Sequence, residues 1–533
     1  KNQYFIKGEH VEIDEALEND GLIGQRDFGG TAKWRACYAA AGTGHAALYA
    51  VDSEVVRLGI TVRDRTEAVA LVHDGSRCLG AVVRCLRTGG HFAVMAKATV
   101  IATGGYGRIY GQYTSNATIN EGTGTSIALD TGIVPLGNME AVQFHPTTLC
   151  PSGILVTEGC RGDGGYLLDK NMNRFMVEKE PEKQELASRD VVSRHMQQTM
   201  RDGNGVDSPY GPHLWLDIRH LGEEHLRTKL LEVWDICRDF AGLNPAEALV
   251  PVRPTQHYSM GGIRVNKDGE AYGLAGLFAV GEAACWDMHG FNRLGGNSLA
   301  ETLVAGRIVG RCVAEHVAGA SLRADTGIAL DALDAAEQRA REWLARSGNG
   351  RSVFEIRDVL GETMMGKVGI FRSGDELEEA VAEIGQLLDD CDNAVLRCKD
   401  PGVNPELGFA LRLKGMLRLA MTVAMGARAR TESRGAHFRS DYPLRNDEEW
   451  LNRTLVRWAL HENSPTFSYE PTGIIDLPPG HRGYGSDERI EMKQSVESHN
   501  EHVLDEQTRH GRLPSTEDMG SRLKRGAWQA YVN

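Results

Sequence analysis

The chain has 533 residues, a length sufficient for about three to four domains of ordinary size. A hydrophobic fraction of 41% and a charged fraction of 25% are typical of a globular protein, and they exclude collagen-like, disordered and disulfide-scaffold classes. With 59 Lys and Arg against 73 Asp and Glu, the net charge of −14 argues against a broad nucleic-acid footprint, so an anionic ligand needs a local cluster of cations.

The sequence contains no stretch of the roughly 18 to 20 apolar residues that a transmembrane helix requires. We therefore expect any association with a membrane to occur through a partner protein or through the surface of this chain. The ten cysteines include no C-x-x-C pair. This predicts buried thiols of a reducing compartment and no zinc or iron–sulfur site built by this chain alone. The chain contains 62 glycines among 533 residues, more than the usual share of about 7%. We expect the extra glycines to serve particular loops or turns.

The first strong strand is predicted at Ala98–Ala102, an apolar run that ends on Thr103-Gly104-Gly105, where glycine lets a ligand approach the backbone. Residues of about 150–253 then change in character. They carry glycine turns, more charge, and helical patterns at Val191–Met200 and Glu223–Phe240. We therefore expect an inserted domain in this region.

A second buried strand is predicted at Gly276–Val280, followed by Gly281 and Glu282. A carboxylate at the carboxyl end of a strand in a doubly wound sheet is typical of an acceptor for a ribose or ribityl hydroxyl. Ser298-x-x-Glu301 has the spacing of a capping box, so we expect a helix from Ser298 to about Ala320. The positive end of its dipole would point at a cofactor atom that becomes anionic on reduction.

The pattern from 325 to 439 is helical with almost no strand signal, for example at Leu330–Ser347, Asp375–Leu388 and Glu406–Arg430. After Trp450–Leu460 the chain is rich in proline, glycine and charge. These patterns predict a helical domain and a small, irregular C-terminal domain.

Histidine, arginine, hydroxyl and glycine residues gather in a few short stretches: His145–Thr147, Thr157–Gly165, Ser188–Asp190, His257–Gly262 and Asn292–Ser298. Such a composition suits a small dianion, because guanidinium groups form bidentate bonds to carboxylates while imidazole, hydroxyl and backbone N–H groups add donors.

Taken singly, the residues of these stretches favour simpler interpretations. His145 precedes a proline and is expected on an extended loop. Arg161 is expected to pair with Asp163 in a glycine turn. Arg189 is likewise expected to pair with its neighbour Asp190.

Taken together, the motifs resemble the flavoprotein subunit of the succinate dehydrogenase and fumarate reductase family, in the family's order and over essentially the whole chain. The motifs are "HPTTL", "TEGCRGDGG", "SRDVVSR", "HYSMGGI", "GLFAVGEAACWDMHGFNRLGGNSLAE" and "TESRGAHFRSDYP". The forms "QRDFGGTAKWRACYAA" and "WDMHGFNRLGGNS" and the ending Asp441-Tyr442-Pro443 are most similar to quinol:fumarate reductases whose membrane subunit carries two haems.

The resemblance implies an α/β flavin-binding (Rossmann-like) domain with an inserted α+β capping domain, followed by a helical domain and a small C-terminal domain. The expected boundaries are 1–149 and 254–324 for the two parts of the flavin-binding domain, 150–253 for the capping domain, 325–442 for the helical domain and 443–533 for the C-terminal domain.

The resemblance also implies a role for each matching residue. The groups that would bind or pack against the substrate are Phe28, His145, Thr157, Glu158, His257 and Arg293. Arg189 would donate a proton to the substrate carbon, with Glu158 and Arg161 as its relay and His145 as a further catalytic group. The positions that would line FAD are Thr103, Gly104, Gly105, His257, Tyr258, Glu282, Arg293, Asn297, Ser298 and Leu299. No metal ligand is implied.

As a member of this family, the chain would interconvert fumarate and succinate. It would exchange electrons with an iron–sulfur subunit and, through a membrane cytochrome b anchor, with menaquinone or another quinone. Haem and iron–sulfur clusters would belong to these partners, in a possible dimer of heterotrimers on the cytoplasmic side of the membrane. The family's first strand, its G-x-G-x-x-G turn and the histidine that binds FAD covalently are not found after Lys1, so we expect on the order of a hundred residues to precede it.

Two alternatives remain open at this point. L-aspartate oxidase shares the flavin fold, the histidine and arginine anchors and the "ESRG" segment, although the "WDMHGFNRLGG" form and the long C-terminal segment argue against it. The other alternative is a catalytically silent subunit with the same fold, against which every matching anchor residue argues. The reaction is reversible, so its physiological direction depends on the quinone potential and not on this chain.

Overall fold

The computed structural model describes residues 24–26, 36–38, 42–322 and 325–473. The chain divides into two compact units. Unit 1 comprises the residues up to Arg445 together with Leu455–Phe467, and unit 2 comprises Asn446–Thr454 and the residues from Ser468 onward. Across the described ranges, no helix is long and apolar enough to cross a membrane.

Two predicted strands from distant parts of the sequence lie side by side. Strands β6 (Thr99–Ile101) and β13 (Leu277–Ala279) pair in parallel, which confirms both strands. Because the pairing is parallel, Thr103 and Glu282, which follow the two strands, lie at the same edge. A Cβ atom on Gly105 would come within 2.5 Å of the Glu282 carboxyl, so this position requires glycine.

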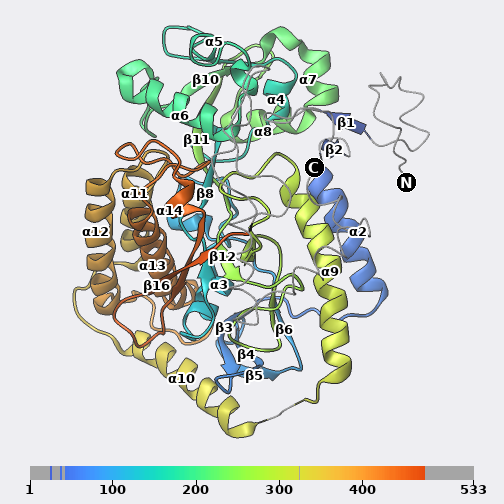
Figure 1. Ribbon diagram of the computed structural model, residues 1–533, viewed down its shortest axis with the longest axis vertical. Helices are drawn as coiled ribbons and strands as arrows, with labels where there is room; N and C mark the ends of the chain where they lie inside the picture. Colours follow the sequence, from blue (N-terminus) through green and yellow to red (C-terminus); the bar gives the residue numbers. More distant parts are fainter. Residues whose placement is uncertain (1–23, 27–35, 39–41, 323–324, 474–533) are drawn as a thin grey trace. The chain divides into compact units, whose positions relative to one another are not determined.

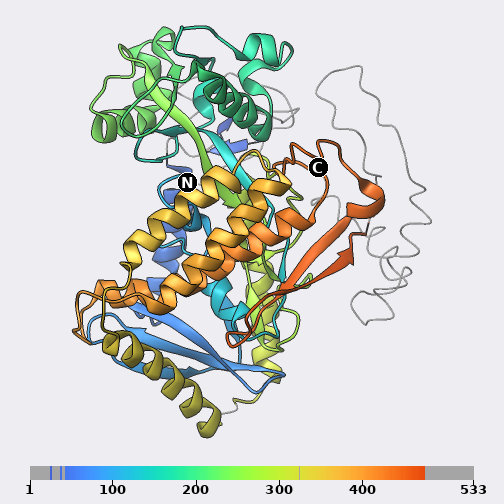
Figure 2. The ribbon, with the colours of Figure 1, turned by 90° about the vertical axis from the view of Figure 1, so that its left-hand side faces the viewer.

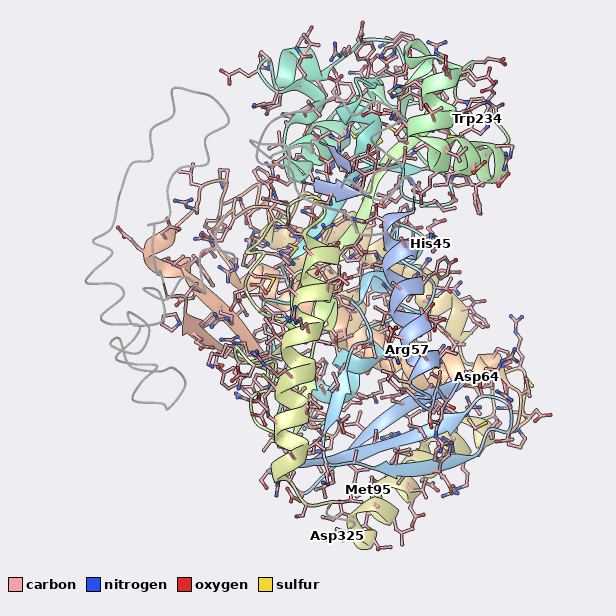
Figure 3. The ribbon with its side chains drawn as sticks, turned by 90° about the vertical axis from the view of Figure 1, so that its right-hand side faces the viewer. His45, Arg57, Asp64, Met95, Trp234 and Asp325 are labelled. Carbon is pink, nitrogen blue, oxygen red and sulfur yellow. The ribbon has the colours of Figure 1, made fainter. Side chains whose placement is uncertain are left out.

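Further sheets and short helices complete this part of unit 1. An antiparallel sheet contains β3 (Thr66–His73), β4 (Cys78–Cys85) and β5 (His91–Met95). A second sheet runs in the order β14 (Ala284–Cys285), β12 (Gly262–Arg264), β7 (Leu136–Gly137) and β15 (Asn452–Arg457). Also present are β1 (Gly24–Arg26), β2 (Ala36–Tyr38), α2 (Thr43–Arg57), η1 (Gly107–Tyr110), α3 (Thr123–Leu129) and η5 (Gly281–Ala283). Figure 3 shows α2 from His45 to Arg57 and the first of these sheets near Met95.

The expected insertion is organised around a four-stranded antiparallel sheet, in the order β8-β11-β10-β9. Its strands are β8 (Val142–Leu149), β9 (Tyr166–Leu168), β10 (Leu214–Asp217) and β11 (Val250–Ser259). Its helices are α4 (Gly159–Gly162), α5 (Met176–Lys179), η2 (Gln184–Leu186), α6 (Arg189–Thr199), η3 (Met200–Asn204), η4 (Arg219–Leu221), α7 (Glu223–Lys229) and α8 (Leu231–Ala241). The long strands β8 and β11 connect this region to the rest of unit 1 (Figure 1).

Most of the predicted helices are confirmed, with one difference in the inserted region. The pattern at Glu223–Phe240 forms two helices, α7 and α8, because Leu230 between them leaves the helical conformation with φ −128° and ψ 33°. The remaining long helices are α9 (Asn297–Gly319), α10 (Thr326–Ala345), α11 (Val353–Lys367), α12 (Gly374–Asn393) and α13 (Pro405–Ala429). Figures 1 and 2 show α11, α12 and α13 packed side by side, as expected for the helical segment.

The longest of these helices, α13, lies in the core of unit 1. Sixteen of its 25 residues are buried, so it is buried around most of its circumference. Asn404 caps its first turn by accepting from Leu407 N–H, and Pro405 occupies the first position, where no N–H is needed. The helix contacts α12, α11, α10 and α3, and thereby joins the helical segment to the preceding part of unit 1.

Unit 2 includes α14 (Asp447–Trp450) and parts of β15 and β16 (Thr466–Pro471). Within it, Arg453 and Glu470 form a buried ion pair at 3.0 Å. The ring of Trp450 meets that of Tyr469 edge to face, with centroids 5.6 Å apart. These contacts hold together the part of unit 2 that the structure describes.

Candidate active site

The strand pair β8 and β11 brings two of the predicted histidines together. The ring centroids of His145 and His257 lie 5.0 Å apart. His145 is fully buried within β8, so the expectation of an extended loop is wrong. Pro146 is accommodated because the pairing of β8 with β11 is irregular beside it, between Arg253 and Thr255.

Glu158 forms the centre of an arginine cluster. The Nε and Nη2 atoms of Arg189 donate to Glu158 Oε2 at 3.0 and 2.8 Å. The Nη2 atom of Arg161 lies 3.6 Å from Glu158 Oε1, and all three side chains are buried. Arg161 also donates to the carbonyl oxygen of Glu185, and burial lowers its pKa.

These contacts overturn the pairings expected from neighbouring residues. Asp163 pairs with His225 at 2.9 Å and not with Arg161. Asp190 pairs with Arg194 at 3.0 Å, one helical turn away. Residues adjacent in a helix point in different directions, whereas residues four positions apart share a face. The side chain of Arg189 is therefore turned away from Asp190 and toward Glu158.

The third arginine, Arg293, lies on the loop that leads into α9. Its guanidinium carbon is 4.4 Å from the centroid of the Tyr258 ring, and its Nη1 donates to the Leu294 carbonyl at 3.1 Å. Burial, reinforced by the positive charge of Arg189, lowers the pKa of Arg293 to about 9. The two cations are thus close enough to repel each other.

The two histidines are neutral donors in this positive field. Burial, followed by the charge of Arg189, holds the pKa of His145 well below its ordinary value of 6.5. Burial and the charges of Arg293 and Arg189 do the same for the pKa of His257. The site therefore presents arginine cations and uncharged imidazoles near the carboxylate of Glu158.

Several buried donors of this site lack a hydrogen-bond partner among the described residues. They are His145 Nε2, Arg189 Nη1, Arg293 Nε, Arg161 Nε and Arg161 Nη2. Buried donors are normally satisfied, and buried cations are normally paired. An anionic ligand with oxygens at both ends meets both requirements, so the arrangement suits a dicarboxylate. Thr157, also predicted for this ligand, is half-buried beside Glu158.

The edge formed by β6 and β13 provides a second set of groups, suited to FAD. The half-buried Glu282 accepts from Ser259 N–H at 2.8 Å, and burial raises its pKa to about 7. Gly104 has φ +73°, a conformation that favours glycine. Glycine backbone and an acceptor carboxylate at one sheet edge fit the polar part of a nucleotide.

The start of α9 differs from the predicted capping box. The helix begins at Asn297, with Gly296 at the N-cap and no side-chain cap. The carboxylate of Glu301 instead accepts from Tyr258 Oη at 2.6 Å and contacts His289 Nε2 at 2.7 Å. The capping-box prediction is therefore wrong. Without a side-chain cap, the N–H groups of Ser298 and Leu299 in the first turn suit an electron-rich atom of FAD.

Sequence reasoning missed several polar residues of the site, and one predicted residue lies outside the described structure. The residues whose role was missed are Gln143, Asp190, Asn292, His289 and Glu301, which hold the segments that carry the arginines and Tyr258. The available signal was the position of Asp190 and Asn292 beside Arg189 and Arg293 and of His289 and Glu301 within a quoted motif, whereas Gln143 lies outside these motifs. Phe28 belongs to residues 27–35, which the structure does not describe.

Comparison with known proteins shows the family of this chain. Residues 3–299 match the model of the FAD binding domain, and residues 357–484 match that of the fumarate reductase flavoprotein C-terminal domain. The fumarate reductase flavoprotein subunit of Helicobacter pylori is 48% identical over 510 residues, covering 90% of this chain and 71% of the relative. The subunit of the same name from Mycobacterium tuberculosis is 38% identical, covering 90% of this chain and 84% of the relative.

Solved structures show the same fold. A structure of E. coli quinol fumarate reductase superposes with a TM-score of 0.82 at 35% identity, covering 86% of this chain and 80% of that chain. This match confirms the expected fold: an α/β flavin-binding domain with an inserted capping domain, a helical domain and a C-terminal domain. The chain belongs to the fumarate reductase and succinate dehydrogenase flavoprotein subunits, a family of FAD-containing oxidoreductases.

Proposed function

We propose that this chain binds fumarate or succinate between its arginines and histidines and catalyses their interconversion. The observation that carries the proposal is the set of buried donors on His145, Arg189 and Arg293 that have no partner among the described residues. His257, Thr157 and Phe28 complete the proposed substrate site. Glu158 pairs with Arg189 and lies 3.6 Å from Arg161, so the one carboxylate is shared between two cations, which favours an anionic ligand.

The groups proposed to hold FAD lie at the β6–β13 edge and at the start of α9. They are Thr103, Gly104, Gly105, His257, Tyr258, Glu282, Arg293, Asn297, Ser298 and Leu299. FAD, when bound, exchanges a hydride with one carbon of the substrate. A covalent link between FAD and a histidine is part of the proposal, as are the domain boundaries expected from the sequence.

Arg189 is proposed to supply the proton for the other carbon. Reduction of fumarate adds a hydride to one alkene carbon and a proton to the other, and oxidation of succinate reverses both transfers. Guanidinium is a poor acid in water, because its positive charge is delocalised over three nitrogens and deprotonation loses that stabilisation. Glu158, bonded to Arg189 at 2.8 Å and 3.6 Å from Arg161, can return the proton to Arg189 through Arg161.

The remaining groups would activate the substrate by holding its two ends. Arg293 and the neutral histidines donate to carboxylate oxygens in a site from which water is excluded. Donors that turn one carboxylate out of the plane of the double bond remove its conjugation and make the carbon more electrophilic. Binding energy at the two ends is thereby used at the reacting carbons.

The proposed partners are an iron–sulfur subunit, which accepts or supplies the electrons, and a membrane cytochrome b anchor, which exchanges them with a quinone. One structural neighbour is described as quinol-fumarate reductase with menaquinol molecules, and it superposes with a TM-score of 0.81 at 34% identity over 86% of this chain and 81% of its own. This similarity supports a place in such a complex. A dimer of heterotrimers on the cytoplasmic side of the membrane completes the proposal.

The test uses the full-length, FAD-loaded enzyme with an artificial electron acceptor. We expect succinate to reduce the acceptor and L-aspartate to leave it oxidised, and we expect a reduced dye to be consumed by fumarate. Preferential oxidation of aspartate would identify an L-aspartate oxidase. A normal flavin absorbance spectrum without turnover of either substrate would identify a catalytically silent subunit.

A further inference from the structure

A partly buried hydrogen bond joins the segment that carries Arg189 to the segment that carries Arg293. Asn292 Nδ2 donates to Asp190 Oδ1 at 2.9 Å, although 102 positions separate the two residues. Asp190 is buried near the start of α6, and Asn292 lies on the loop that leads into α9. The bond therefore connects the inserted region to the part of unit 1 that precedes the long helices.

Both ends of this bond are held by further partners. Gln143 Nε2 donates at 2.7 Å to Asn292 Oδ1 and at 2.7 Å to the carbonyl oxygen of Arg293. The oxygen of the Asn292 amide is thus an acceptor, which turns its nitrogen toward Asp190. On the other side, Asp190 accepts from Ser188 Oγ at 2.5 Å and pairs with Arg194 at 3.0 Å.

The pair lies one residue from each of two arginines that repel each other. Arg189 directly precedes Asp190, and Arg293 directly follows Asn292. The charge of Arg189 acts on Arg293, and neither guanidinium bonds to the other. This repulsion favours a larger distance between the two guanidinium groups. The bond between their neighbours opposes an increase in this distance.

We infer that Asp190 and Asn292 are positioning residues that hold Arg189 and Arg293 at the spacing required by the two ends of one dicarboxylate. Each of the two residues acts through the arginine beside it. The inference rests on the proposed function, because it takes the ligand to be a small dicarboxylate. By this inference, the inserted region helps to fix the distance between the two arginines that would bind the substrate.

The test changes the Asn292–Asp190 hydrogen bond in the full-length, FAD-loaded enzyme, first by replacing its donor and then by exchanging its donor and acceptor. Asn292→Asp places a second carboxylate against Asp190, and the two like charges repel. We expect the KM for fumarate and the Kd for malonate to rise about tenfold together. Malonate is a suitable probe because it has two carboxylates but no CH–CH bond to oxidise, and its binding can be followed by flavin absorbance. We expect kcat to stay within threefold, because Arg189 keeps both bonds to Glu158.

The double variant Asp190→Asn with Asn292→Asp restores the bond in the opposite direction. The new amide at 190 donates to the new carboxylate at 292, which still accepts from Gln143. We expect KM and Kd to return to within threefold of the native values. Asp169→Asn is the matched control, because Asp169 is another buried carboxylate of the inserted region, held at 2.8 and 2.9 Å by the N–H groups of Asn171 and Asn173. It should leave both constants unchanged.

The outcomes separate this inference from the proposed function. Native turnover together with an unchanged KM and Kd in Asn292→Asp would overturn the positioning role alone. Equal losses in the single and the double variant, with a matching fall in the thermal unfolding midpoint, would show a packing defect and overturn it as well. A native enzyme that neither reduces fumarate nor binds malonate would overturn the proposed function and this inference together.

Discussion

Replacing Arg189 by lysine separates the charge of this residue from its geometry. In the structure, two nitrogens of Arg189 bond to Glu158 Oε2 at 2.8 and 3.0 Å, while Nη1 has no partner among the described residues and is available to the substrate. Lysine keeps the positive charge but has one nitrogen in place of this fork. It can contact Glu158 or the substrate, but it cannot link the two as arginine does.

The size of the effect follows from the role assigned to Nη1. A positioned acid contributes about 10²- to 10⁴-fold to a rate, equivalent to about 2.7 to 5.5 kcal/mol in activation free energy. We therefore expect kcat of Arg189→Lys to fall by about that factor. The KM for fumarate should change by less than about tenfold, because His145, His257 and Arg293 still hold the carboxylates. Arg189→Ala should likewise retain flavin and substrate binding and abolish turnover.

The assay measures fumarate-dependent oxidation of a reduced dye by the FAD-loaded enzyme, with the flavin absorbance spectrum taken to match FAD content between variants. Malonate binding, followed through the same absorbance, shows whether the substrate site is intact. Turnover of Arg189→Lys within tenfold of the native rate would refute the acid role of Arg189. A loss confined to KM would instead make Arg189 a binding residue.

Three further predictions concern charge. Burial lowers the pKa of Arg293 to about 9, so its cation is lost as the pH rises through that value. We therefore expect kcat/KM for fumarate to fall about tenfold per pH unit above about pH 9. A kcat/KM that stays constant up to about pH 10.5 would contradict this prediction. Glu282→Ala should lower the FAD content measured by absorbance, since the acceptor at the β6–β13 edge is lost, and a full complement of FAD would argue against that role. Arg430→Met removes the 2.9 Å ion pair with the buried Glu140 and should lower the free energy of unfolding in urea by about 3–5 kcal/mol. Lys414→Met removes the exposed ion pair with Asp392 and should lower it by at most about 1 kcal/mol. Equal losses of stability in the two variants would contradict this prediction.

Local patterns in the sequence were sufficient to place most of the elements near the site. The run Ala98–Ala102 and the run Gly276–Val280 are apolar and end on glycine, and both are strands in the structure. The helical periodicity at Glu406–Arg430 corresponds to α13 almost residue for residue. These patterns are reliable because the information lies within one element, as alternation, periodicity and terminal residues.

The side-chain partners within the site could not be predicted in this way. Arg161 and Arg189 were expected to pair with the nearest aspartates, but both turn to Glu158, which is 31 positions from Arg189. Glu301 has the spacing of a capping box, yet its carboxylate contacts Tyr258, 43 positions away. A buried charge takes the partner that packing places beside it, because in the interior no water competes for the bond.

The sequence by itself determined the family, the strands and helices, and the residue types that suit a dianion and a flavin, because motifs and periodicities are local. Only the tertiary structure decided which of these residues meet. It placed His145 inside a strand against His257, gathered Arg161 and Arg189 around Glu158, and joined Asp190 to Asn292 across 102 positions. The physical reason is that these contacts depend on how β8, β11, α6 and the loop before α9 pack together, and such packing is a property of the whole unit.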